Sequence, residues 1–376
     1  MVAGELLRAY SGAIPRAQAL AAIVVVGPDA VAAAMVDIDA YLGKSSPGQQ
    51  WLCDCVVDAR EAMSPGQDPV RHQHLISEVV LGHFSRPPRG NQRVGDVQSY
   101  DLKLCQQRKP AQPSGLGWTS DYFKVDSRRM EELWGSVETR LPLAYQAANA
   151  SDVPKDGTVL ETFREAAILH FVRNPTLAES HNVSWEKVQN NYYKRLIREI
   201  VLANPGLPLA GILAGLSRQR MGKLNRDGGT LFRLEAERQF ENWRAMLASA
   251  PIEFVRPAKD EEFLIGDVPV LAYREVDGAL APAIHIGLNN ADSLVFPIAS
   301  DLLLRIHFRR GGPSFATVAT AGRVAEFNKA QVLAARRVLD SPARTRPSKS
   351  SVYYRPGAKF QAVIAQWLAD AGAASP

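Results

Sequence analysis

Three polar side chains of this sequence have chemistry suited to a catalytic site, although they lie far apart along the chain: His74, Arg173 and Asp267. An ordinary histidine exchanges a proton near neutral pH, so His74 is a natural general acid or base. Asp267 stands before Pro269 at the end of an apolar run, where a carboxylate emerges onto a turn. The planar guanidinium of Arg173 can bind a phosphate or a carboxylate.

Each of these residues also has a structural interpretation. His74 can equally be a core histidine, Asp267 can accept backbone N–H bonds in a turn, and Arg173 can bond the last carbonyls of its helix. Glu138, a fourth candidate, lies six residues from Glu132 on one expected helix, so these two carboxylates do not form a pair by themselves. Glu138 together with Asp267 or His74 would make a small set of acid–base groups. Helical glutamates more commonly form solvent-exposed salt bridges.

The elements that must position these residues are mostly helices. Residues 1–67 are rich in alanine and have periodic apolar positions, which predicts a small helical bundle. Apolar stripes at three-to-four spacing predict further helices at Val70–Phe84, Ser127–Ala148, Val159–Val172, Ser184–Ala203, Gly229–Ala248, Ala321–Leu339 and Lys359–Ala369.

Short runs with strand-like patterns occur mainly after Pro251. They predict strands at Ile252–Val255, Phe263–Ile265, Val268–Tyr273, Ala283–Ile286, Ser293–Phe296 and Leu302–Phe308, and a hairpin between Arg93 and Leu104. The expected fold class is α+β, predominantly helical with a small antiparallel sheet in the C-terminal half. Two parts are expected: an N-terminal helical extension of residues 1–67 and a main domain of residues 68–376.

Composition and missing motifs narrow the functional classes. Hydrophobic residues make up 46% and charged residues 22%, which is typical of a globular protein. No apolar run reaches membrane-spanning length and no basic leader is apparent, so a cytoplasmic location without membrane contact is expected. The three cysteines have neither disulfide nor zinc spacing, so no metal site is predicted. Phosphate-loop, dinucleotide and nucleophile-elbow motifs are absent, and the cofactor stays unknown.

Basic residues are unevenly distributed along the chain. One basic cluster spans Arg218–Arg226 and a second lies in the C-terminal quarter. Aromatic residues alternate with basic ones at Tyr192–Arg198 and Tyr353–Arg355. Such stripes can bind a phosphate backbone and stack on bases. Amphipathic helices with a solvated basic face show the same pattern.

Several motifs in a fixed order carry a resemblance to a known family. In Val70–Phe84, His74 keeps the second histidine of a histidine pair, while Gln73 replaces the first and Ser77 replaces a proline. The other matching motifs are Asp121–Phe123, His170–Pro175, Phe263–Val270, Leu294–Ile298, and Asn328, Gln331 and Arg336. Over Val70 to Pro356 the chain resembles DUF4238, bacterial proteins of unknown function. The N-terminal helices lie outside this resemblance.

Two functions follow as hypotheses. The first is a hydrolase-like or nuclease-like enzyme acting on a nucleic acid or another phosphate-containing substrate, and orphan families of this kind also suggest a bacterial toxin or defence effector. Its catalytic residues would be His74, Glu138 and Asp267, with substrate bound by Arg173, Asn328 and Arg336. The alternative is a non-catalytic binding or scaffold protein that recruits a macromolecule, with a protein partner possible through the N-terminal helices.

Overall fold

A computed structural model describes residues 72–87, 94–120, 127–175, 177, 230–276, 279–282, 290–309, 311–340 and 350–373, together with residues 23, 28, 31, 32, 54–57 and 59. The chain divides into two units, one of Met1–Arg71, Asp121–Glu132 and Ser180–Gln239, the other of His72–Ser120, Leu133–Glu179 and Phe240–Pro376. In the N-terminal region the few described residues are helical. Outside the described residues lie most of the predicted N-terminal bundle, the predicted helix 184–203, the predicted strand 283–286 and the basic stretches 192–198 and 218–226.

The largest sheet has six strands in the order β11-β5-β10-β9-β7-β8. Its strands are β5 (Ile252–Pro257), β7 (Leu271–Val276), β8 (Ala279–Pro282), β9 (Ser293–Ala299), β10 (Leu302–His307) and β11 (Phe315–Ala319). Neighbouring strands are antiparallel except β11, which runs parallel to β5. Every residue of β9 is buried, as expected for a central strand covered on both faces.

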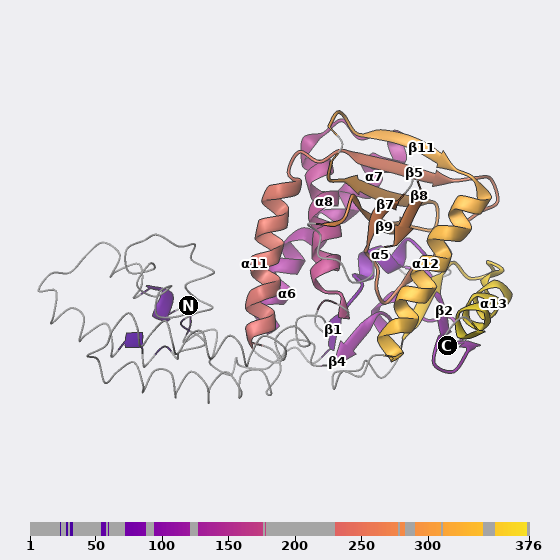
Figure 1. The fold of residues 1–376 in the computed structure, drawn as a ribbon, viewed down its shortest axis with the longest axis horizontal. Coiled ribbons are helices and arrows are strands. Elements are labelled where there is room, and N and C mark those ends of the chain that lie inside the picture. The colour runs from indigo at the N-terminus through magenta and orange to yellow at the C-terminus, as the bar shows by residue number, and fades with distance from the viewer. Residues whose placement is uncertain are drawn as a thin grey trace, which may run out of the picture. The chain divides into compact units, whose positions relative to one another are not determined.

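Helices cover both faces of this sheet. Helix α12 (Ala321–Asp340) packs on one face, where Val324 and Phe327 join Val255 and Leu303 in one hydrophobic cluster. On the other face, helix α8 (Gly157–Val172) places the ring of Phe163 5.8 Å from that of Phe254 of β5. Figure 1 shows α8 and α12 on opposite sides of the strands. Each large apolar side chain buried in this way contributes about 1.5–3 kcal/mol, which makes these layers the main source of stability.

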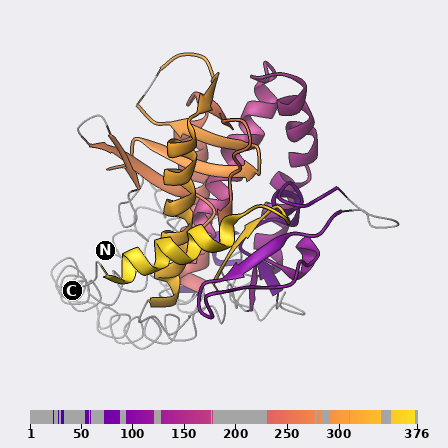
Figure 2. The same cartoon turned by 90° about the vertical axis from the view of Figure 1, so that its right-hand side faces the viewer.

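A second sheet, with four strands, brings together segments that are distant in the sequence. Its order is β3-β2-β12-β6, with β2 (Gln98–Asp101), β3 (Gln106–Gln107), β6 (Ile265–Gly266) and β12 (Ser351–Tyr354). It packs on α12 and on α13 (Phe360–Ala373) through a shared apolar cluster, and Figure 2 shows α13 in yellow beside the purple strands. A separate two-stranded ribbon joins β1 (His72–His74) to β4 (Trp118–Ser120).

The predicted fold class is therefore wrong in its balance of elements. The chain is α+β with 46% of the described residues in helices and 24% in strands. The main sheet is six-stranded and mixed, neither small nor purely antiparallel, and the second sheet begins before the C-terminal half, at β2. Sequence patterns missed this because short buried strands lack a clear period and their pairing is not local.

Two predicted helices are also divided differently. Within the predicted helix Val70–Phe84, residues 72–84 form β1 and then only a short helix, α5 (Glu78–Gly82), because Ser77 caps a new helix by accepting a hydrogen bond from the N–H of Val79. Ser127–Ala148 forms α6 (Ser127–Glu138) and α7 (Leu141–Ala150), with a proline in the first turn of α7. Proline fits a first turn but interrupts a continuous helix. In contrast, α8, α11 (Thr230–Leu247), α12 and α13 lie close to their predicted ranges.

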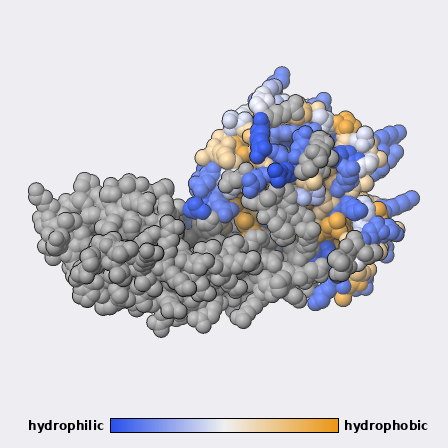
Figure 3. All heavy atoms as spheres, in the orientation of Figure 1, coloured by the Kyte–Doolittle hydropathy of each residue, from blue (hydrophilic) through white to orange (hydrophobic). Residues whose placement is uncertain are grey.

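On the face drawn in Figure 3, hydrophilic residues in blue are interspersed with hydrophobic residues in orange. The large apolar side chains exposed in the second unit come from different elements: Val94 before β2, Leu104 after β2, Leu143 on α7, Met246 on α11 and Val318 on β11. Apolar residues scattered singly in this way are normal on a protein surface.

Gly266 of β6 lies directly against α12. A Cβ atom added there would stand 3.0 Å from the carbonyl oxygen of Gln331 and 3.1 Å from the Cβ of Ala335. We expect Gly266→Ala to lower the free energy of unfolding by about 1–3 kcal/mol, because the helix must move away from the sheet. Urea denaturation measures this. Gly157→Ala is the control, since an added Cβ there meets no atom within 4 Å; equal losses in both variants would refute the packing explanation.

Candidate functional site

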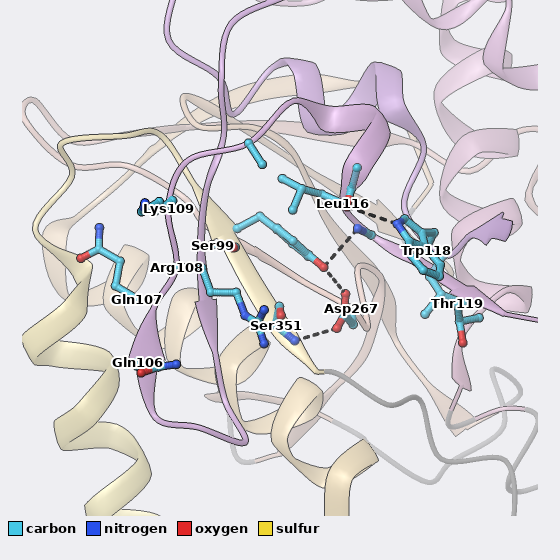
Figure 4. A pocket seen from close by; sticks show the side chains of 15 residues that line it. Ser99, Gln106, Gln107, Arg108, Lys109, Leu116, Trp118, Thr119, Asp267 and Ser351 are labelled. Atoms are coloured by element: carbon cyan, nitrogen blue, oxygen red, sulfur yellow. Dashed lines mark hydrogen bonds between the residues drawn. The ribbon is translucent and has the colours of Figure 1, made fainter.

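A cavity of about 490 Å³ lies in the second unit, between the second sheet and the segment that leads into β4. Its walls come from residues 106–109, residues 115–119 and strand β12, and Asp267 also lines it. Figure 4 draws Gln106, Gln107 and Lys109 on one side of the cavity and Trp118 and Asp267 on the other. A cavity of this size with a few converging polar groups suits a small ligand.

Asp267 is held by hydrogen bonds on both carboxyl oxygens. Oδ2 accepts from the backbone N–H of Ser351 at 2.6 Å, and Oδ1 accepts from the hydroxyl of Tyr353 at 2.8 Å. The Tyr353 oxygen in turn accepts from the N–H of Gly117 at 3.2 Å. Figure 4 shows these three bonds as one chain. Because Gly117 has φ +65° and an added Cβ would stand 3.0 Å from Leu81, glycine is required at this close approach.

Burial changes the acidity of this carboxyl group. Asp267 is only 4% exposed, and its burial raises its pKa from 3.8 to about 7, with a smaller contribution from the charge of Asp101; the bonds from Tyr353 and Ser351 oppose the rise. Burial likewise raises the pKa of Tyr353 well above its usual value, so this hydroxyl keeps its proton. Asp267 is thus the group in the network that can exchange a proton near neutral pH.

Two cations stand beside the cavity, Arg108 and Lys109. Arg108 bonds the carboxylate of Asp101 through Nε at 3.0 Å and also through Nη2, yet its side chain is 38% exposed. Burial alone would raise the pKa of Asp101, but the bonds from Arg108 and from backbone N–H groups outweigh it and lower that pKa. Trp118 is oriented by a bond from its indole N–H to the carbonyl of Gly115. The cavity therefore combines positive charge, an aromatic ring and a titratable carboxyl group.

Three of the candidates from the sequence come together in a second place, the buried arginine cluster, which comprises His74, Trp134, Glu138 and Arg173. Arg173 is 1% exposed and is the residue that ends α8. Its Nη1 donates to Oε1 of Glu138 at 2.7 Å, and its guanidinium carbon lies 3.6 Å from the centre of the Trp134 ring. Such stacking on an aromatic face suits arginine more than lysine.

His74 belongs to this cluster through its electrostatics. Burial lowers its pKa, the charge of Glu78 raises it, the charge of Arg173 lowers it again, and Glu138 has a smaller raising effect. Nε2 of His74 lies 3.5 Å from Oε1 of Glu78 and has no hydrogen-bond partner. The net effect lowers the pKa of His74 and so favours the neutral ring.

His170, which also belongs to a motif of the resemblance, has a structural role because both of its ring nitrogens lie against backbone groups. Its Nε2 accepts from the N–H of Ser77 at 3.1 Å and its Nδ1 lies 2.7 Å from the carbonyl of Ala166. Burial lowers its pKa to about 4, so the ring is neutral with its proton on Nδ1. It fixes the start of α5 against α8.

The remaining candidates join α12 to the rest of the fold. Asn328 accepts from the N–H of Leu264 at 3.0 Å and donates to the carbonyl of Glu262 at 2.8 Å. Arg336 donates to the carbonyl of Leu102 at 2.9 Å. These bonds satisfy buried backbone groups. Among the described groups, no hydrogen bond or ion pair joins Asp267 to the buried arginine cluster.

Sequence reasoning missed the partners that build the cavity. Tyr353 was interpreted as one member of an aromatic and basic stretch, yet it is buried beside Asp267. Gly117 and Arg108 belong to no motif that the sequence patterns identified. In the described ranges no three histidine, cysteine, aspartate or glutamate side chains are grouped to hold a metal ion, and none of the helices described there is long and apolar enough to cross a membrane.

The fold and the cavity define an α+β protein with a titratable carboxyl group in a pocket of ligand size. The chain belongs to the family described as "Protein of unknown function (DUF4238)", whose sequence profile matches residues 72–341. This match confirms the resemblance noted in the motifs over residues 72–341, and residues 1–71 and 342–376 lie outside it. No curated protein and no solved structure matches the chain.

Proposed function

We propose that this protein is an enzyme that binds a phosphate-bearing substrate, a nucleotide or a nucleic-acid strand, in the cavity and uses Asp267 as its general acid. One observation carries the proposal: a buried carboxyl group with a pKa of about 7 lines the same cavity as Arg108 and Lys109. Strongly perturbed groups in a pocket are more often functional than those elsewhere.

The chemistry follows from the charge states. Below a pH of about 7 the carboxyl group of Asp267 is neutral. Its proton passes to the leaving oxygen of a phosphate ester as the bond from that oxygen to phosphorus breaks, while water attacks phosphorus and releases a proton to solvent. The carboxylate left behind accepts from Tyr353 and Ser351, as in the folded chain. The ammonium of Lys109 offsets negative charge of the substrate, the Asp101-bonded guanidinium of Arg108 can donate to its oxygens, and Trp118 offers a face on which a base can stack.

An activity screen with Asp267→Asn tests this proposal. Across nucleotides, phosphomonoesters and phosphodiesters, we expect turnover that falls as pH rises through about 7 and that drops about 100-fold or more in the variant, because a general acid contributes at least that much. Asp301→Asn, which changes an exposed carboxylate with a side-chain exposure of 67%, is the matched control. Turnover that Asp267→Asn leaves unchanged, or no turnover on any of these substrates, overturns the proposal.

Binding without turnover is the second candidate. The observation that favours it is that both oxygens of Asp267 already accept bonds that hold β12 against the segment after β6, so the carboxyl group also has a structural task. Calorimetric titration with a nucleoside monophosphate separates the two candidates. Binding that Asp267→Asn retains, in a protein inactive on every substrate tested, selects the binding protein.

A further inference from the structure

The buried arginine cluster contains a hydrogen-bond donor without an acceptor. Nε of Arg173 is buried and has no hydrogen-bond partner, although Glu138 and Trp134 hold the rest of the guanidinium in place. An unsatisfied buried donor costs about 1–3 kcal/mol, and more when it is charged. Native proteins seldom leave such groups without a ligand or an ordered water.

A second unused nitrogen belongs to the same cluster. Nε2 of His74 has no hydrogen-bond partner, while the ring also bonds the backbone of Ser114. The charged groups around this ring come from three helices: Glu78 of α5, Glu138 of α6 and Arg173 at the end of α8. Nε of Arg173, a donor, and Nε2 of His74, which can gain a proton, are thus two nitrogens of this cluster without a hydrogen-bond partner, and the charge of Arg173 acts on the His74 ring.

The charge balance of the cluster favours an anion as that ligand. Glu138 neutralises Arg173 through one bond, and the Glu78 side chain is 51% exposed, so water screens its charge. An oxyanion accepts from a guanidinium N–H, and its charge makes protonation of a nearby histidine more favourable. A cation would face the charge of Arg173, and the carboxylate of Glu138 already accepts from that guanidinium.

We propose that the buried arginine cluster is a site for a small oxyanion, phosphate or carboxylate, which accepts a hydrogen bond from Nε of Arg173 and binds together with a proton on Nε2 of His74. The site is separate from the proposed enzyme function, because neither residue lines the cavity over Asp267. The anion enters from solution, and no covalent step is involved.

Sulfate binding to the full chain tests the site, because the charge of sulfate is constant between about pH 5 and 8, where histidine titrates. We expect sulfate to bind about tenfold more tightly at about pH 5.5 than at 7.5, and to raise the pKa of His74 measured by NMR, since proton and anion binding are linked. Acetate is the carboxylate probe; stronger binding of sulfate than of acetate identifies phosphate as the natural group.

Two variants locate the binding. Arg173→Lys removes Nε and should abolish binding, whereas Arg256→Lys, which changes an arginine bonded to Ala148 and Asp301, should leave it intact. His74→Gln keeps the buried guanidinium and should remove the pH dependence of binding, so the proposal stays testable if Arg173→Lys does not fold. Equal sulfate affinity in Arg173→Lys, or a His74 pKa that neither anion changes, means an adventitious ion or a buried water and overturns the proposal.

Discussion

The free energy of unfolding is expected to fall as pH rises from about 4 to 7, and Asp267→Asn is expected to remove most of this fall. The pKa of Asp267 rises from 3.8, its ordinary value, to about 7 in the folded chain, so between these pH values the folded protein binds one more proton than the unfolded chain. Stability from this group therefore falls as pH rises from about 4 to 7 and is constant above 7. The full difference amounts to roughly 4 kcal/mol.

Urea denaturation at about pH 5 and pH 8 measures this effect as a difference between the wild type and Asp267→Asn, because groups common to both proteins cancel. The wild type should lose about 2–3 kcal/mol relative to the variant over this range, since about two of the pKa units lie above pH 5. Asp301→Asn controls for the general effect of removing a carboxylate. A difference that does not change with pH would show that Asp267 is ionised in the folded protein at both pH values.

Arg173→Met is expected to lower the free energy of unfolding by about 3 kcal/mol or more, because it breaks a largely buried ion pair and removes the group stacked on Trp134. Glu138, 25% exposed, can turn to solvent, which places the loss at the lower end of the range for buried pairs. Thermal and urea unfolding both report it.

Arg323→Met is the matched control for that variant. Arg323 also forms an ion pair, with Glu326, and lies 4.8 Å above the Phe327 ring, but its pair is exposed on α12. Exposed pairs contribute about 0–1 kcal/mol. If both substitutions cost the same, burial of the Arg173 pair has no energetic consequence and the cluster does not stabilise the fold.

The helices were largely predictable because their apolar periods extend over several turns. The ranges of α8, α11, α12 and α13 agree with their patterns within a few residues. The division between α6 and α7 was missed, although Pro142 marks it. The start of α5 was missed because a three-residue strand precedes it, and a run this short cannot be told from helix by period alone.

The strands that build the cavity were not predictable in the same way. Strand β12 pairs with β2 across some 250 residues of sequence and also with β6, and no local pattern encodes such a pairing. Strand β11 joins the main sheet in parallel beside β5, which turned an expected antiparallel sheet into a mixed one. The Tyr353 hydroxyl reaches Asp267 only through this topology.

The candidate residues were identified with mixed success for a physical reason. Polar residues between a helix and a sheet bond backbone groups, as the buried Asn328 and the partly buried Arg336 do, and their sequence signature is the same as that of ligand-binding residues. His74, Glu138 and Arg173 do converge, but Asp267 lies in a separate site. Residue type indicated the chemistry, whereas only the fold determined which groups meet.

The most direct test of the central claim is the pH titration of the Asp267 carboxyl carbon by NMR in the full chain, with and without a nucleoside monophosphate. We expect a midpoint near 7 in the free protein and a shift of that midpoint when the nucleotide binds in the cavity. A midpoint near the ordinary value of about 4, unchanged by the nucleotide, would contradict the assignment of Asp267 as the proton-exchanging group of a phosphate-binding site.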